Sequence, residues 1–216
     1  MRQQASSTEL LGRTLTACNH AGVPLTILFN KVDILEGDSE TLEAVEQELF
    51  EMTLNDVPIH YISVTERQAE TEQLLRPLLE GKRTLILGQS GMGKSTLINL
   101  LIPGALAATN EISMALNAGK HTTTHTQMHF GENGLELIDS PGFQAFGLHH
   151  LSEADLLNAF SDIQEEGNKC RFANCQHKRE PDCAVKNGLE DGSLSPARYE
   201  LYQMLKAELE EARNSY

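Results

Sequence analysis

The chain has 216 residues, of which 40% are hydrophobic, and its formal net charge is −14 at neutral pH. This apolar content is enough for a packed core and excludes a mostly disordered chain. No apolar run approaches the roughly 18–20 residues that span a bilayer, and the polar start is not that of a signal peptide. We therefore expect a soluble, cytoplasmic protein with no membrane partner.

The acidic total argues by itself against nucleic acid as a partner, because an acidic surface repels a phosphate backbone. The charge is unevenly distributed, however. Residues 168–187 carry five basic and two acidic side chains, and three of the four cysteines lie in the same segment. The total charge is therefore a poor guide to what this segment can bind.

Helical and strand patterns alternate along the chain. Helices are predicted from residue 8 to Gly22, at about 39–53, near 69–80, from the glycine-rich loop to just before Pro103, near 152–161 and from Ser195 to about Arg213. Strands are predicted at Leu25–Phe29, Ile59–Val64 and Thr84–Leu87, with a hairpin of Gln127–Phe130 and Leu135–Ile138. Residues 104–124 lack periodicity and are predicted to form a mobile loop. The alternation predicts an α/β sandwich around a mainly parallel sheet.

Residues 88–95 match the phosphate-loop pattern G-x-x-x-x-G-K-[ST] between a predicted strand and a predicted helix. Backbone N–H groups of such a loop surround a β-phosphate at the positive end of the helix. Lys94 is placed to reach the β- and γ-phosphates, and the Ser95 hydroxyl to bind Mg²⁺. The predicted nucleotide-binding residues are Gly88, Gln89, Ser90, Gly91, Met92, Gly93, Lys94, Ser95 and Thr96.

A second motif predicts guanine as the base. The pattern N-K-x-D is matched by Asn30-Lys31-Val32-Asp33 after a buried strand. Its Asp carboxylate accepts hydrogen bonds from guanine N1–H and the 2-amino group, which adenine cannot offer. Ser63, at the end of the next strand, resembles the loop that supports the base. Each pattern alone is also typical of an ordinary turn or strand end.

A third motif, D-x-x-G, is matched by Asp139-Ser140-Pro141-Gly142. Its Asp would hold Mg²⁺ through water, and the Gly142 N–H would contact the γ-phosphate; alone, the pattern also fits a Pro-Gly turn. In ordinary GTPases the phosphate loop precedes D-x-x-G, N-K-x-D and the supporting loop. Here the last two come first, which indicates a circular permutation, a change that surface termini make easy.

The basic segment carries a metal-binding pattern. Three thiols and one imidazole are spaced as C-x4-C-x-H-x5-C, in Cys170, Cys175, His177 and Cys183. They form a complete tetrahedral set for one structural Zn²⁺ with no open position for catalysis. The alternative is three buried cysteines and a surface histidine. Cys18 is predicted to be an ordinary core residue.

The permuted order, the loop Gly119-Lys120-His121-Thr122-Thr123-Thr124 and the cysteine knuckle together resemble the RsgA (YjeQ) family of bacterial GTPases. The resemblance extends over about residues 7–205. It implies a three-layer phosphate-loop GTPase domain at residues 1–160 and a zinc-binding and C-terminal helix region at 161–216. It also implies GTP and GDP as ligands, with Mg²⁺.

The same resemblance implies a function in ribosome assembly. Family members hydrolyse GTP when stimulated by the small (30S) ribosomal subunit, assist its late maturation and release an assembly factor. The partners would be the small subunit and its rRNA, with the basic knuckle as the RNA-facing part. We expect a monomer.

The hydrolysis mechanism depends on the predicted mobile loop. Phe143, directly after D-x-x-G, cannot orient the attacking water as a Gln does in many GTPases. The resemblance suggests His121 for that role, which an imidazole can perform; a surface-loop histidine is the alternative. One of Thr122–Thr124 should complete the Mg²⁺ shell, with Thr123 and Thr124 as the candidates.

Two departures from the family pattern are visible. Family members begin with an RNA-binding OB-fold barrel and a strand that lies between the phosphate-loop and N-K-x-D strands; neither is found in this sequence. We expect five strands, unpaired ladder groups where the central strand is missing, and a chain that is a truncated product, a fragment or a wrongly started one.

Two other functions stay open. One is a permuted GTPase that acts on the large ribosomal subunit, which the knuckle and the T-T-T loop disfavour. The other is a remnant that binds nucleotide or RNA without efficient hydrolysis, which the missing strand and barrel favour.

Overall fold

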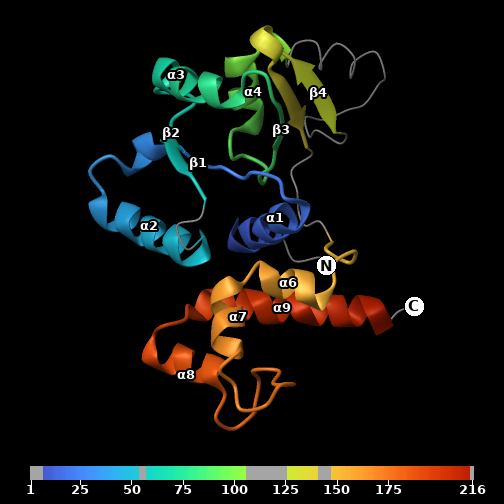
Figure 1. Ribbon diagram of the computed structural model, residues 1–216. Helices are drawn as coiled ribbons and strands as arrows, with labels where there is room; N and C mark the ends of the chain where they lie inside the picture. Colours follow the sequence, from blue (N-terminus) through green and yellow to red (C-terminus); the bar gives the residue numbers. More distant parts are fainter. Residues whose placement is uncertain (1–6, 54–56, 106–125, 141–146, 215–216) are drawn as a thin grey trace. The chain divides into compact units, whose positions relative to one another are not determined.

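The computed structural model describes residues 7–53, 57–105, 126–140 and 147–214 (Figure 1). Its helices are α1 (Ser7–Ala21), α2 (Ser39–Thr53), α3 (Gln68–Leu79), α4 (Lys94–Leu101), α6 (Glu153–Asn158), α7 (Ser161–Gly167), α8 (Ala184–Asp191) and α9 (Pro196–Asn214). Its strands are β1 (Ile27–Asn30), β2 (Ile59–Ile62), β3 (Arg83–Ile86), β4 (Gln127–Phe130) and β5 (Glu136–Asp139), and short 3₁₀ helices are η1 (Val32–Leu35) and η2 (Glu132–Gly134). No helix in these ranges is long and apolar enough to cross a membrane.

The chain divides into two compact units, each with its own internal packing. The sheet unit comprises Met1–Ser7, Thr26–Leu42 and Ile59–Ala145. The helical unit comprises Thr8–Leu25, Glu43–Pro58 and Phe146–Tyr216. The GTPase and zinc regions predicted at 1–160 and 161–216 are functional divisions, and they stay predictions.

Strand ends position the three nucleotide motifs of the sheet unit. β1 and β2 are parallel, β3 and β5 are parallel, and β4 runs antiparallel to β5. N-K-x-D begins with Asn30, the last residue of β1, the glycine-rich loop follows β3, and D-x-x-G begins at Asp139, the last residue of β5. In parallel sheets, ligands bind outside the carboxyl ends of the strands.

The core of the sheet unit joins α3 and α4 to β2 and β5. Its buried members are Ile62, Val64, Leu75, Leu97, Ile98, Leu101, Ala105, Leu135 and Leu137. α3 and α4 contact each other, and α4 contacts β5. The predicted α/β class is confirmed, and the predicted strands are found within one or two residues of their expected ends.

The strands form two separate sheets, one of β1 and β2 and one in the order β3-β5-β4. Five strands occur in the described residues, as expected. β1 and β3 each have a ladder partner on one edge only within that part of the chain. The Leu85 side chain of β3 is 51% exposed, although strands of parallel sheets are usually covered. The sheet is thus divided between the phosphate-loop strand and the N-K-x-D strand.

The helical unit has its own core, centred on α9. Its largest fully buried side chain is Tyr202, whose ring packs against Phe160 of the α6–α7 connection. The other buried members are Met52, Leu148, Leu151, Leu156, Ile163, Cys183, Val185, Leu194, Leu201, Leu205 and Leu209. Buried Arg198 donates to both carboxylate oxygens of Asp162 (2.8 and 2.9 Å) and to the Met52 carbonyl (2.6 Å). Such a fully paired guanidinium can be buried without a large penalty.

Two sequence expectations are corrected in this unit. The helix expected near 152–161 is found as α6 but ends early, at Asn158, because Phe160 leaves the helical conformation (φ −120°, ψ 61°). The Phe160 ring is 98% buried and lies under the Arg198 guanidinium, 4.9 Å from it, so tertiary packing overrides the helical pattern. Helix α7, which begins at Ser161, is not predicted from the sequence. Helix α8, directly after Cys183, is not predicted from the sequence.

Candidate nucleotide site and metal centre

The glycine-rich loop between β3 and α4 depends on residues without a side chain. Gly91 and Gly93 have φ angles of 82° and 96°, in the left-handed region that glycine tolerates. A Cβ atom on Gly93 would lie 2.5 Å from Asn30 Nδ2, so the loop can approach the N-K-x-D motif only with glycine there. The glycine-rich loop therefore packs against the N-K-x-D motif, the second predicted nucleotide motif.

Lys94 begins helix α4 and lies over the loop. Its ammonium donates to the carbonyls of Gly88 (2.6 Å) and Gln89 (2.9 Å). Burial lowers the pKa of Lys94, and the nearby Asp139 carboxylate opposes that shift. The cation is therefore held among carbonyls of the glycine-rich loop, and its contact with phosphates stays a prediction.

Asn30 joins three segments that are distant in sequence. Its Nδ2 donates to the Met92 carbonyl (2.9 Å), and its Oδ1 accepts from the backbone N–H of Val64 (3.2 Å). Lys31 adds a second link, from Nζ to the Gly91 carbonyl (3.0 Å). The N-K-x-D loop, the loop beside Ser63 and the phosphate loop are thus brought together.

Two carboxylates of the sheet unit each have one buried oxygen that is not paired within the described residues. Within the described ranges, Oδ1 of Asp33 and Oδ1 of Asp139 have no hydrogen-bond partner. Burial raises the pKa of Asp139, while the charges of Lys94 and His129 oppose that change. Buried polar atoms are nearly always paired in native proteins. Asp33 therefore fits a base N–H donor, and Asp139 fits a cation such as Mg²⁺.

The remaining predicted nucleotide residues are partly described. Ser63 is fully buried and accepts from the Glu66 N–H (3.2 Å), so its hydroxyl is engaged within its own loop. The others in the described ranges lie in η1 (Val32), the loop (Ser90) and the first turn of α4 (Ser95, Thr96). Outside those ranges lie Gly142, His121, Thr123 and Thr124. All of these assignments stay predictions.

The structure adds one residue that sequence reasoning does not assign. The Ser140 hydroxyl donates to the Ile86 carbonyl (2.7 Å), at the point where β3 enters the glycine-rich loop. Ser140 is 99% buried, and it fixes the start of D-x-x-G against the phosphate-loop strand. Its position inside D-x-x-G is visible in the sequence, but its partner across the sheet is not.

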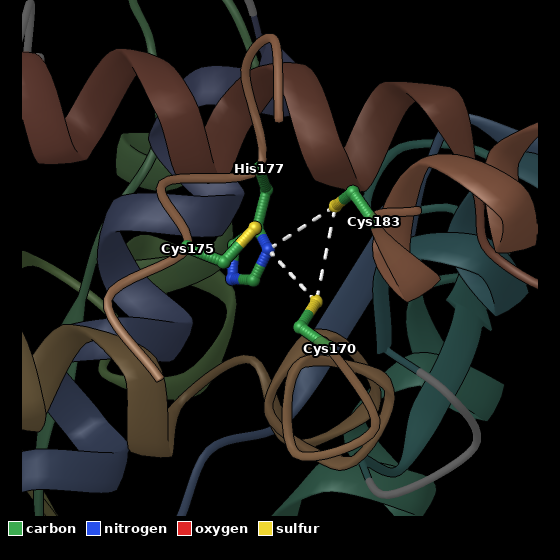
Figure 2. Close-up of side chains that lie close together, drawn as sticks. All are labelled: Cys170, Cys175, His177 and Cys183. Carbon is green, nitrogen blue, oxygen red and sulfur yellow. Dashed lines mark hydrogen bonds between the residues drawn. The ribbon is translucent and has the colours of Figure 1, made fainter. Parts of the chain in front are cut away.

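The four predicted zinc ligands lie together in the helical unit (Figure 2). Cys170 Sγ is 3.9 Å from Cys183 Sγ, and His177 Nδ1 is 3.6 and 3.5 Å from these two sulfurs. Ligands in a tetrahedron around Zn²⁺ are separated by about 3.8 Å (sulfur–sulfur) and about 3.6 Å (sulfur–nitrogen). All four ligand atoms lie within 4.8 Å of one another. The residues therefore fit a four-coordinate zinc ion, bound through Nδ1 of His177.

Local electrostatics favour metal-ligating forms of two of these groups. Partial burial raises the pKa of Cys170, but hydrogen bonds from the Val185 and Ala184 backbone N–H groups and from the Cys175 and Cys183 thiols together lower it, and the net pKa is lowered. Burial and the Lys206 ammonium lower the pKa of His177 while the Glu180 carboxylate opposes the shift, and the lowered pKa favours the neutral imidazole. Burial and the neighbouring thiols raise the pKa of Cys175 to about 11. Since thiolates and neutral imidazoles bind metals, zinc uptake would release protons.

The metal centre is continuous with the hydrophobic core. Cys183 is 98% buried and belongs to that core, and Cys170 and Cys175 pack against it. Cys18, outside the cluster, is half-buried, and burial raises the pKa of its thiol. A closed Cys₃His set inside a core is typical of structural zinc sites.

The strand, glycine loop and helix, with Asn30 fastened to the loop, define a phosphate-loop nucleotide-binding protein of the α/β class. A family model described as RsgA GTPase matches residues 1–149. The chain belongs to this family.

Curated relatives extend the similarity across both units. Proteins named small ribosomal subunit biogenesis GTPase RsgA are 43% identical over 199 residues in Burkholderia mallei, 41% over 214 in Ralstonia pickettii and 44% over 203 in Neisseria meningitidis. The alignments cover 92%, 96% and 94% of this chain. The chain spans 62%, 66% and 63% of the length of these relatives.

Solved structures agree with the fold. YjeQ from Thermotoga maritima superposes with a TM-score of 0.66 at 27% identity, and the match covers 96% of this chain and 68% of that one. YloQ, described as a circularly permuted GTPase, gives a TM-score of 0.67 at 26% identity, covering 97% and 65%. The expected family and the permuted fold are thereby confirmed.

Proposed function

We propose that the chain binds and hydrolyses GTP and assists late maturation of the small ribosomal subunit, releasing an assembly factor. The observation that carries the proposal is the fastening of the N-K-x-D loop to the phosphate loop by Asn30 and Lys31. An adenine-specific site would leave this arrangement without a role. The ribosomal partner is inferred from the names of the relatives, which are small ribosomal subunit biogenesis GTPases.

In this proposal each group of the site has a separate task. Asp33 accepts from the guanine N1–H and 2-amino groups, and the Lys31 stem covers the base. Lys94 meets the β- and γ-phosphates, while Ser95 and Asp139, with Thr123 or Thr124, hold Mg²⁺. A magnesium ion held there would neutralise charge that develops on the phosphates. His121 would orient the attacking water.

The remaining parts of the proposal concern metal and partners. Cys170, Cys175, His177 and Cys183 would hold one structural zinc ion, and the basic knuckle around them would face rRNA. In this proposal the chain acts on the ribosomal subunit as a monomer. It does so in the cytoplasm. The divided sheet supports a second candidate, a protein that binds nucleotide or RNA without efficient hydrolysis.

Hydrolysis in the presence of ribosomal subunits separates these possibilities. The full chain is incubated with GTP and Mg²⁺ alone, with purified small subunits and with purified large subunits. We expect small subunits to raise turnover at least about tenfold, since GTPase activators often give larger effects. Stimulation by large subunits only would favour a large-subunit function, and nucleotide binding without stimulated hydrolysis would favour the remnant.

The role of His121 is tested in the same assay. His121→Ala should lower small-subunit-stimulated turnover at least about tenfold, the size of a typical acid–base contribution, and leave GTP affinity nearly unchanged. His149→Ala, an exposed histidine of the helical unit, is the matched control. Unchanged turnover in the His121 variant would remove this residue from the mechanism.

A further inference from the structure

The histidine among the four predicted zinc ligands occupies an unfavourable backbone conformation. His177 has φ 62°, in the left-handed region that non-glycine residues rarely adopt. Nδ1 must nevertheless lie at about 3.5 Å from two cysteine sulfurs for a tetrahedral site. Neighbouring groups must therefore hold the dipeptide Gln176-His177 in place.

One face of helix α9 contacts this dipeptide at three points. Tyr199 donates its hydroxyl to the His177 carbonyl (2.6 Å), and Gln203 Nε2 donates to the Gln176 carbonyl (3.3 Å). Lys206 donates from Nζ to the Gln176 side-chain oxygen (2.5 Å). The spacing i, i+4, i+7 places these side chains on one face of the helix. They form a row that runs along the metal loop.

Lys206 is the unusual member of this row. Its side chain is only 4% exposed, yet it carries a charge that pairs with Glu153 Oε1 (2.5 Å) in the first turn of α6. Glu153 is 45% exposed. The buried Lys206 ammonium therefore links Gln176, beside the histidine ligand, to a partly exposed carboxylate of α6. A buried ammonium is costly unless it is paired, and here both partners fix its position.

Two further contacts hold the same loop from the other sides. The Glu180 carboxylate accepts from the backbone N–H groups of Gln176 (2.9 Å), Lys178 (2.9 Å) and Arg179 (3.0 Å). A Cβ atom built on Gly167 would lie 3.4 Å from the His177 ring, so the end of α7 lies beside the imidazole. The loop is thus fixed independently of the metal-ligating atoms.

We propose that Tyr199, Gln203 and Lys206 of α9 are positioning residues of the metal centre, which hold His177 ready to complete the zinc site. We call this set the α9 clamp. It rests on the proposed zinc site and not on GTP hydrolysis. Outer partners of metal ligands typically change metal affinity by about 10–100-fold when removed. The clamp predicts effects in that range from changes that touch no ligand.

The test compares zinc affinity of full-length variants by competition with a chromophoric chelator. Tyr199→Phe keeps the ring and removes one donor, and Lys206→Met keeps the stem and removes the charge. Each should weaken zinc binding about tenfold or more. Met204→Ala, on an exposed position of the same helix, is the matched control and should bind as the wild type does.

A spectroscopic readout separates positioning from general stability. With Co²⁺ in place of zinc, the visible ligand-field bands of Tyr199→Phe and Lys206→Met should shift or broaden, whereas those of Met204→Ala should not. Zinc affinities and Co²⁺ spectra equal to wild type in Tyr199→Phe would overturn the clamp, even if Lys206→Met does not fold. A wild-type chain that binds no zinc would overturn the metal centre and the clamp together.

Discussion

The metal centre and the nucleotide site are built in different ways. The zinc ligands come from a segment of 14 residues, their ligand atoms lie within 4.8 Å of one another, and the three cysteines belong to a hydrophobic core or pack against it. The nucleotide residues come from three strand ends and meet through side-chain bonds such as those of Asn30. The first site is local and rigidly supported, and the second depends on the assembly of a sheet that is in two pieces. Changes at the metal centre should therefore lower the stability of the helical unit, whereas changes at the nucleotide site should lower ligand affinity.

The largest expected effect is the loss of a zinc ligand. Cys183→Ser should reduce zinc content from about one ion per chain to none and destabilise the helical unit by at least about 2 kcal/mol, since a core thiol and the metal are lost together. Zinc content is measured by atomic emission and unfolding by circular dichroism. Cys18→Ser, outside the cluster, is the control and should keep the metal. Full zinc content in Cys183→Ser would show that the closed site is misassigned.

A smaller effect, confined to ligand binding, is expected at the base-binding motif. Asp33→Asn should weaken GTP binding about 10–100-fold, because a charged hydrogen-bond acceptor is replaced by a neutral amide. The amide can donate to the 2-oxo group of xanthine, so affinity for xanthosine triphosphate should rise. Fluorescent-nucleotide titrations measure both.

The control for this change is Asp38→Asn, in the same segment of the chain. Asp38 accepts from the Thr41 N–H and belongs to a helix start, not to the motif. It should leave both affinities unchanged. If Asp33→Asn and Asp38→Asn behave alike, the N-K-x-D motif does not contact the base.

A third effect, on folding stability alone, is expected where α1 meets α9. A Cβ atom on Gly12 would lie 2.0 Å from the Leu201 side chain, which is 93% buried. Gly12→Ala should lower the free energy of unfolding by about 1–3 kcal/mol through overpacking, although alanine favours a helix by itself. Thermal unfolding measures this, with Asn19→Ala on an exposed position of α1 as the control. Increased stability would mean that the two helices do not approach so closely.

The two sites also differ in how much the sequence predicts. Ligand spacing is local, so the sequence alone predicts Cys170, Cys175, His177 and Cys183 as a set. It predicts the phosphate loop for the same reason. It does not predict the α9 clamp, because Tyr199 and Lys206 lie 22 and 29 residues beyond His177 and no local pattern pairs them.

The missed elements have similar causes. Phe160 breaks a predicted helix because its ring is needed in the core, under Arg198. Helix α8 has eight residues and follows directly on a zinc ligand, in a segment that the sequence analysis assigns to metal binding. The separation of β1 and β3 into two sheets, by contrast, agrees with what motif order and strand count predict.

Nucleotide selectivity tests the assignment of the sheet unit most directly. The full chain is titrated with GDP and with ADP in the presence of Mg²⁺, by isothermal calorimetry. Because the Asp33 carboxylate would pair with two guanine donors that adenine lacks, GDP should bind at least about 100-fold more tightly than ADP. Equal affinities for the two nucleotides, or no binding of either, would contradict a guanine-nucleotide site built from the N-K-x-D and phosphate loops.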